Sequence, residues 1–225
     1  MNIPAAKRAE FSAVTVHCAY PDGKLVGSRF PCVDWLDSNS IEVVHRWRSE
    51  GEKWGFQRTD IMRAFPFPEN IQDYVPEGIV WTQISLKYKT RFVNEILRTY
   101  HQTPGSIMNK RSCTPQSAEG TALWMSSVFE HEWPYFVYNK LWFLRCGVNF
   151  TRFHLHQKKD PISRAFKYKG SATALILALS PVGCLAYVLD RSGTMEYLRK
   201  AIRRPAGQES LENTQIQLPD PGEQT

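Results

Sequence analysis

The chain has 225 residues, 42% of them hydrophobic, and carries 28 Lys and Arg against 22 Asp and Glu, a formal net charge of +6. This hydrophobic content excludes a wholly disordered chain and is enough for one sizeable core. Five scattered cysteines, never closer than 14 residues apart, exclude a disulfide framework and a CxxC zinc site. The chain begins with no charged-then-apolar leader, so we expect reduced thiols and a cytoplasmic or nuclear location.

Alternating side chains predict β-structure in the N-terminal quarter. Residues 12–20 alternate apolar and polar before the turn signal Pro21-Asp22-Gly23, and apolar residues resume at 24–30, so this region reads as a β-hairpin. A second pair of strands is predicted at 41–48 and 54–62, on either side of a short polar segment.

The middle of the chain is predicted to contain one long strand and one clear helix. Within residues 78–92, Val80, Thr82 and Ile84 share one face, and Lys87, Lys89 and Arg91 share the other, which indicates a strand with one buried and one basic face. A short helix is expected at 93–100 and a surface loop at 101–113. Thr114-Pro115 then begins a helix to about Glu130.

Strands are again predicted at 135–144 and 147–156, where aromatic and β-branched residues are frequent. The most apolar stretch, 172–189, is interrupted by Ser180-Pro181 and Gly183, and we expect a hairpin there, although its first arm suits a buried helix equally well. Neither half reaches the roughly 20 residues that span a bilayer, so no transmembrane segment is predicted.

The C-terminal end is predicted to hold one more helix, capped by Thr194 and running to about Arg204. Taken together, the patterns indicate an α+β fold of predominantly antiparallel β-hairpins with two or three helices and a disordered C-terminal tail. We expect a frayed N-terminus at 1–10, a single domain at 11–206 and a disordered acidic tail at 207–225.

Positive charge is concentrated in the C-terminal third. Residues 145–204 hold twelve Lys and Arg and three acids, a net charge of +9, whereas residues 205–225 hold four acids and no base. Such a field attracts nucleic acid, anionic lipid headgroups or acidic protein surfaces. The leading hypothesis is a non-enzymatic accessory or structural protein that binds nucleic acid, RNA or DNA, by phosphate contacts and by stacking. The predicted contacts are Lys87, Lys89, Arg91, Arg152, Lys158, Lys159, Arg164, Lys167, Tyr168, Lys169, Arg199, Lys200, Arg203 and Arg204.

The same cations suit a second hypothesis, a peripheral protein of matrix or coat type that docks on an anionic membrane. Phosphate-binding glycine loops are absent from the sequence, and no cofactor or bound metal is expected. Protein partners are not predictable from these patterns.

A third hypothesis rests on Phe153-His154-Leu155-His156 and Tyr197-Leu198-Arg199-Lys200. These eight positions resemble the His-hydrophobic-His and Tyr-x-x-Lys signatures of rolling-circle replication nucleases. The resemblance implies that His154 and His156 share one face of a strand and bind a divalent metal, with Tyr197 as the nucleophile.

Overall fold

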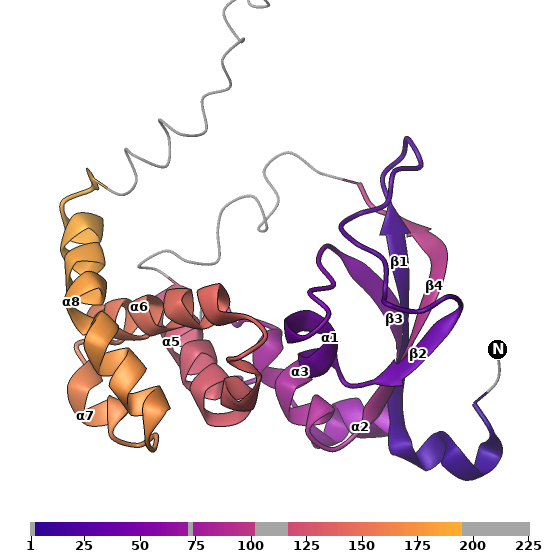
Figure 1. The fold of residues 1–225 in the computed structure, drawn as a ribbon, viewed down its shortest axis with the longest axis horizontal. Helices are drawn as coiled ribbons and strands as arrows, with labels where there is room; N and C mark the ends of the chain where they lie inside the picture. The colour runs from indigo at the N-terminus through magenta and orange to yellow at the C-terminus, as the bar shows by residue number, and fades with distance from the viewer. Residues whose placement is uncertain (1–2, 72–73, 102–116, 195–225) are drawn as a thin grey trace, which may run out of the picture. The chain divides into compact units, whose positions relative to one another are not determined.

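The structure is a computed structural model that describes residues 3–71, 74–101 and 117–194 (Figure 1). The chain forms two units, residues 1–187 and 188–225, and the boundary falls near the end of the last described helix. The fold is mixed α+β, as predicted. The predicted last helix and acidic tail lie outside the described residues, apart from Thr194.

A four-stranded mixed sheet has the order β2-β4-β1-β3. Strand β1 (Phe11–Ala19) pairs antiparallel with β3 (Lys53–Gln57) and parallel with β4 (Lys89–Thr99), which pairs antiparallel with β2 (Trp35–Ser38). No two neighbouring strands of this sheet are consecutive in sequence. The prediction of predominantly hairpin connections was therefore wrong for this sheet.

The predicted first hairpin is only partly present. Its first arm is β1, which is buried along most of its length because it has a neighbouring strand on each side. Its second arm keeps a single bridge, between Ala19 and Leu25. Beyond this bridge the chain turns away at Gly27, whose φ of 81° only glycine adopts readily.

The side chain of Asn94 ties the loop after this turn to β4. Its Oδ1 accepts from the Phe30 backbone N–H at 3.0 Å and lies 2.7 Å from His17 Nε2, while its Nδ2 donates to the Phe30 carbonyl at 3.1 Å. Burial lowers the pKa of His17, and its ring stacks on Phe30 with the ring centroids 4.3 Å apart. The Asn94 side chain thus takes the place of the backbone hydrogen bonds that a neighbouring strand would make to this loop.

Short helices occupy two of the predicted strands. Helix α1 (Ser40–His45) begins at Asn39, whose side chain accepts from the Glu42 N–H at 2.8 Å. Helix α3 (Gly78–Ser85) replaces most of the predicted strand at 78–92. The strand predictions were wrong because these helices are short and are covered on several sides. The buried residues of such a helix need not recur with the helical period, so the sequence pattern does not distinguish it from a strand.

Other segments near these helices also have a type of secondary structure that differs from the prediction. Helix α2 (Thr59–Ala64) occupies the end of the predicted strand 54–62, of which β3 is the beginning. Strand β4 covers the predicted helix at 93–100. Before β1, residues predicted to be frayed form an exposed 3₁₀-helix, η1 (Ala5–Glu10).

Helix α5 (Ala118–Ser127) confirms the helix predicted to end near Glu130. It continues into a π-helix, η3 (Val128–Glu132), and a 3₁₀ turn, η4 (Trp133–Tyr135). Helix α6 (Lys140–His156) then covers most of two predicted strands, which was a wrong prediction. Its buried residues Phe143, Gly147, Phe150 and His154 recur at helical spacing, and this period outweighs the β propensity of its aromatic residues.

The last two described helices are α7 (Pro161–Ala165), capped by Asp160, and α8 (Ser171–Arg191). Helix α8 replaces the predicted hairpin at 172–190 and runs through Pro181. The main core cluster joins α5, η3, α6, α7 and the start of α8, and it includes Phe129, Phe143, Phe150 and Ile176.

Candidate functional site

Helix α8 has a narrow buried side made largely of small residues. Ala172, Ile176, Ser180 and Gly183 are buried, and they follow one another at helical spacing. Ser180 Oγ lies 3.2 Å from Thr151 Oγ1 of α6, and a Cβ added at Gly183 would lie 2.6 Å from Thr151 Cβ. The small side chains therefore allow α8 to approach α6 closely.

The outward side of α8 is apolar and exposed. Ala174, Ala178, Pro181, Val182 and Leu185 are all exposed, with 51% of Val182 and 58% of Leu185 accessible to solvent. The helix has no charged residue between Ser171 and Leu189. A surface helix normally turns charged and polar residues toward water, so this face is reversed from the usual pattern.

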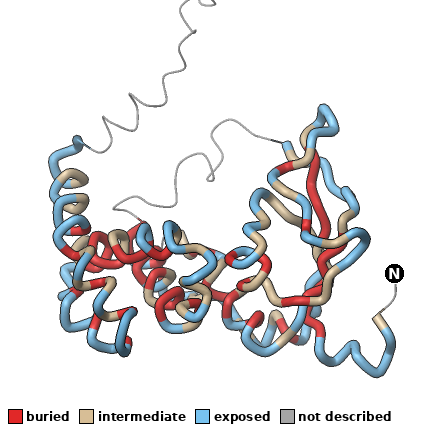
Figure 2. Tube along the Cα trace, viewed as in Figure 1, coloured by how far each residue is buried: buried red, intermediate tan, exposed pale blue. Residues whose placement is uncertain are grey.

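The length and hydropathy of α8 match those of membrane-interacting helices. It has 21 residues, its most apolar stretch has a mean hydropathy of 2.0, and only 22% of that stretch is buried. Figure 2 shows the helix mostly in the colours of exposed and half-buried residues. By length and composition it is sufficient to cross a bilayer. The basis for predicting no transmembrane segment, an interruption at Ser180-Pro181 and Gly183, was therefore wrong.

Cations precede α8 in the chain. Lys158, Lys159, Arg164 and Lys169 are exposed, in the turns on either side of α7 and within it. Lys167 lies 3.0 Å from Glu130, and this bond raises the pKa of Lys167. The exposed cations therefore lie within a short stretch of chain that leads directly into the apolar helix.

Three of the predicted nucleic-acid contacts are buried. Arg91 is 5% exposed and makes two hydrogen bonds of 2.7 Å to the Asp37 carboxylate, with its guanidinium 4.0 Å from the Trp35 ring centroid. Arg152 is also buried, on α6. Tyr168 is in the main core, where its hydroxyl donates to the Ser126 carbonyl and burial raises its pKa. These side chains are held in the fold and do not present a phosphate-binding face.

Lys87, Lys89 and Arg91 do not form the predicted basic face of one strand. Lys87 lies just after α3, with its ammonium 5.1 Å from the Phe65 ring centroid, and Lys89 begins β4 and pairs with Glu10 at 3.1 Å. Both side chains are therefore separate from the cations near α8 in sequence and in secondary structure. The remaining predicted contacts, Arg199, Lys200, Arg203 and Arg204, lie outside the described residues.

The His-x-His pair of the nuclease hypothesis is on helix α6, not on a strand. Side chains two positions apart on a helix point in different directions, so His154 and His156 do not share a face. His154 Nδ1 donates to the Phe150 carbonyl at 2.7 Å, and the His156 ring contacts the Tyr187 ring at 4.7 Å between centroids. Among the described residues no group of three His, Cys, Asp or Glu is arranged to hold a metal. Tyr197 is outside the described range.

Comparisons of the chain with family models, curated proteins and solved structures find no match. The fold and this surface define a mixed α+β protein that carries an exposed apolar helix behind a cationic segment. Sequence reasoning missed the outward residues Val182 and Leu185 because Pro181 indicated a break. The absence of charge over the whole of 171–189 was the signal that could have identified them.

Proposed function

We propose that this protein is a peripheral membrane protein that binds an anionic bilayer through the outward face of α8 and the cations that precede it. The observation that carries the proposal is the low burial of the most apolar stretch of α8, which has a mean hydropathy of 2.0 and of which only 22% is buried. A core helix of a water-soluble protein with this hydropathy would bury most of its surface. The exposed face instead requires an apolar environment, which the acyl region of a bilayer supplies.

The packing of α8 favours a helix that lies along the membrane surface. Its small-residue side contacts α6 through Ser180 and Gly183, so only the outward side is available to lipid. Burying a large apolar side chain contributes about 1.5–3 kcal/mol when the burial is complete. Val182 and Leu185, each about half exposed, therefore supply a useful part of the binding free energy.

The cations near α8 add electrostatic attraction to anionic lipid. Lys158, Lys159, Arg164 and Lys169 are exposed, and each base close to an anionic surface contributes about 1 kcal/mol at physiological salt. Nucleic acid would use the same charges but would leave the apolar face in water. This difference favours a membrane over the predicted nucleic-acid partner.

Co-sedimentation with lipid vesicles tests the proposal. The full chain is mixed with phosphatidylcholine vesicles with and without phosphatidylserine, and Leu185→Glu is compared with wild type. We expect wild type to bind the phosphatidylserine vesicles and Leu185→Glu to bind at least about tenfold more weakly, because a carboxylate on this face would enter the apolar layer.

Val33→Glu is the matched control, since Val33 is 90% exposed in a loop far from α8 in sequence and its substitution introduces the same charge. Equal losses of vesicle binding in both variants would mean that the change in net charge alone explains the loss. If wild type binds no vesicle but binds single-stranded RNA with a steep salt dependence, the nucleic-acid hypothesis replaces this one. Resistance of the bound protein to alkaline carbonate would indicate that α8 spans the bilayer instead of lying on it.

A further inference from the structure

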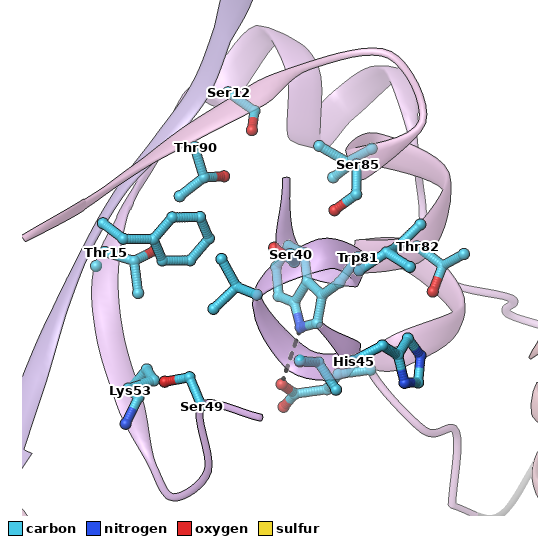
Figure 3. A pocket seen from close by; sticks show the side chains of 18 of the residues that line it. Ser12, Thr15, Ser40, His45, Ser49, Lys53, Trp81, Thr82, Ser85 and Thr90 are labelled. Atoms are coloured by element: carbon cyan, nitrogen blue, oxygen red, sulfur yellow. Dashed lines mark hydrogen bonds between the residues drawn. The ribbon is translucent and has the colours of Figure 1, made fainter. Parts of the chain in front are cut away.

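Two pockets in the described part of the chain differ in the charge of their walls. The larger, of about 460 Å³, is lined by the sheet and by helices α1 and α3, and Figure 3 shows the hydroxyl groups of Ser85 and Thr90 around it. Among Lys, Arg, Asp and Glu, its wall has one cation, Lys53, and two acids, Glu77 and Glu132. A wall of this composition does not favour an anion.

The smaller pocket has the opposite balance of charge. It has a volume of about 180 Å³ and is lined by residues of α5, the C-terminal end of α6 and α7. Lys159 and Arg164 line it together with a single acid, Glu119. All three residues are exposed, so the charged groups are accessible to a ligand. The volume is below the roughly 300–1,000 Å³ of sites for drug-sized molecules and suits a small charged group.

The two positive charges of this pocket lie near one residue. His154 also lines the pocket, and its pKa is lowered first by burial and then by the charges of Arg164 and Lys159. A charge has this effect only from nearby, so both cations lie close to the His154 ring. Two like charges that converge in this way repel each other, and an anion between them would remove the repulsion.

Ordered backbone holds both cations in place. Lys158 follows α6 with a φ of 57°, the left-handed conformation that commonly ends a helix. The N–H of Lys159 then donates to the His154 carbonyl at 3.0 Å. Arg164 is on α7, whose first turn is capped by the Asp160 carboxylate. The two side chains therefore extend from fixed positions on either side of one tight connection.

Neither cation is neutralised by a carboxylate within the described ranges. Lys159 Nζ donates to Gln157 Oε1, which is a neutral oxygen, and Arg164 has no ion pair with any described residue. Lys167, three residues further along, is different, because it pairs with Glu130 at 3.0 Å. The pocket thus offers two positive charges that are available to an anionic ligand.

We infer that this pocket binds a phosphomonoester, a phosphate group attached through a single oxygen. Such a group carries a charge of about −1.5 to −2 at pH 7 and presents three acceptor oxygens, which match two cations. A carboxylate or a phosphodiester carries a single charge and matches them less well. Arg164 suits phosphate further, because a guanidinium donates two parallel hydrogen bonds to its oxygens.

Both soluble molecules and lipids such as phosphatidic acid carry this group, and the residues next to Arg164 favour a lipid. Ile162 and Phe166 are 42% and 66% exposed, and they are four positions apart, so they lie on the same side of the turn. These side chains would enter the acyl region while the headgroup phosphate occupies the pocket. The lipid form of the ligand rests on the proposed membrane function, whereas the phosphate pocket itself does not.

Co-sedimentation with vesicles tests the lipid form. The full chain is mixed with phosphatidylcholine vesicles that contain phosphatidic acid, or enough phosphatidylserine to give the same surface charge. We expect about tenfold tighter binding to phosphatidic acid, and Lys159→Gln should remove this preference because a charge-assisted bond to the phosphate is lost. Lys158→Gln is the matched control. Lys158 is exposed but does not line the pocket, so its replacement should weaken binding to both lipids alike and keep the preference.

A calorimetric titration with glycerol 3-phosphate tests the pocket without a membrane. We expect saturable binding to the full wild-type chain and about tenfold weaker binding to Arg164→Gln. Glu119→Gln should bind more tightly than wild type, because it removes the one acid that opposes an anion in the pocket. Damage to the fold would not produce such a gain in affinity.

The two experiments separate failure of the pocket from failure of the membrane proposal. Preference for phosphatidic acid without binding of glycerol 3-phosphate would identify a lipid ligand. Binding of glycerol 3-phosphate without any vesicle binding would identify a soluble ligand and refute the membrane proposal. Equal binding to both anionic vesicles, with no binding of glycerol 3-phosphate, would overturn the phosphate pocket and leave the membrane proposal intact. Loss of the preference in Lys158→Gln as well as Lys159→Gln would also overturn it.

Discussion

At the scale of single residues, His154 shows how burial changes chemistry. Its ring is buried against Phe150, and its Nδ1 donates to the Phe150 carbonyl. Desolvation lowers the pKa of His154 to about 4, and the nearby charges of Arg164 and Lys159 act in the same direction. The side chain is therefore a neutral core residue at pH 7, whereas the nuclease hypothesis required a metal ligand.

Acid should destabilise the protein through this residue. Between pH 6.5 and 4 an unfolded His154 binds a proton that the folded one excludes, so stability present above pH 6.5 is lost as the pH falls. The full difference is about 3 kcal/mol. Urea unfolding at pH 7 and pH 4.5 should show a smaller drop in His154→Asn, which retains a donor for Phe150. An unchanged drop would refute the assignment.

Arg91 illustrates a cation that is structural. Its two bonds to Asp37 and its position over Trp35 need a planar guanidinium, which lysine lacks. We expect Arg91→Lys to lower the free energy of unfolding by about 1–3 kcal/mol and to leave vesicle binding unchanged. Chemical denaturation and co-sedimentation measure the two effects. Unchanged stability together with weaker vesicle binding would mean that Arg91 acts as a surface contact and not as a structural residue.

At the scale of elements, the contact between α6 and α8 depends on small residues. Gly147 lies against Leu179, and Gly183 lies against Thr151 and the Val148 carbonyl. Close packing of this kind holds one side of α8 on the protein and leaves the other side outward. The same packing determines which residues of the apolar stretch are exposed.

A larger side chain at Gly183 should separate the two helices. A Cβ there would lie 2.6 Å from Thr151 Cβ and 2.7 Å from the Val148 oxygen, which is too close for either. We expect Gly183→Val to lower the midpoint of thermal unfolding, at a cost of about 1–3 kcal/mol. Ala178→Val, on the exposed side of the same helix, is the control and should have little effect. Equal effects would contradict this packing.

At the scale of the whole molecule, the proposed membrane binding depends on where the exposed bases lie and not on the net charge of +6 alone. Replacing Lys158, Lys159 and Arg164 by Gln should weaken binding to phosphatidylserine vesicles by about 3 kcal/mol, on the order of 100-fold, and reduce its salt dependence. Lys24→Gln, an exposed base beside Asp22, is the comparison. Equal losses from this single change would mean that the total charge, not its position, directs binding.

Local patterns in the sequence predicted burial better than they predicted the type of element. The mixed α+β class, strand β1 and helix α5 were predicted correctly, and Val80, Thr82 and Ile84 are buried as expected, although on a helix. For α1 and α3, a short apolar run fits a strand or a buried helix equally well. Contacts with the rest of the fold decide between them.

By itself, the sequence determined the distribution of charge along the chain: an uncharged run at 171–189, with bases before it. Only the tertiary structure decided that this run is one helix with an exposed side, because the stripe from Ala172 to Gly183 packs on α6 while residues on the opposite side, such as Val182 and Leu185, are exposed within the described part of the chain. The tertiary structure also brought His45, Thr82 and Glu132 together from distant parts of the chain. Residues so far apart in sequence meet only through long-range packing, which no local pattern encodes.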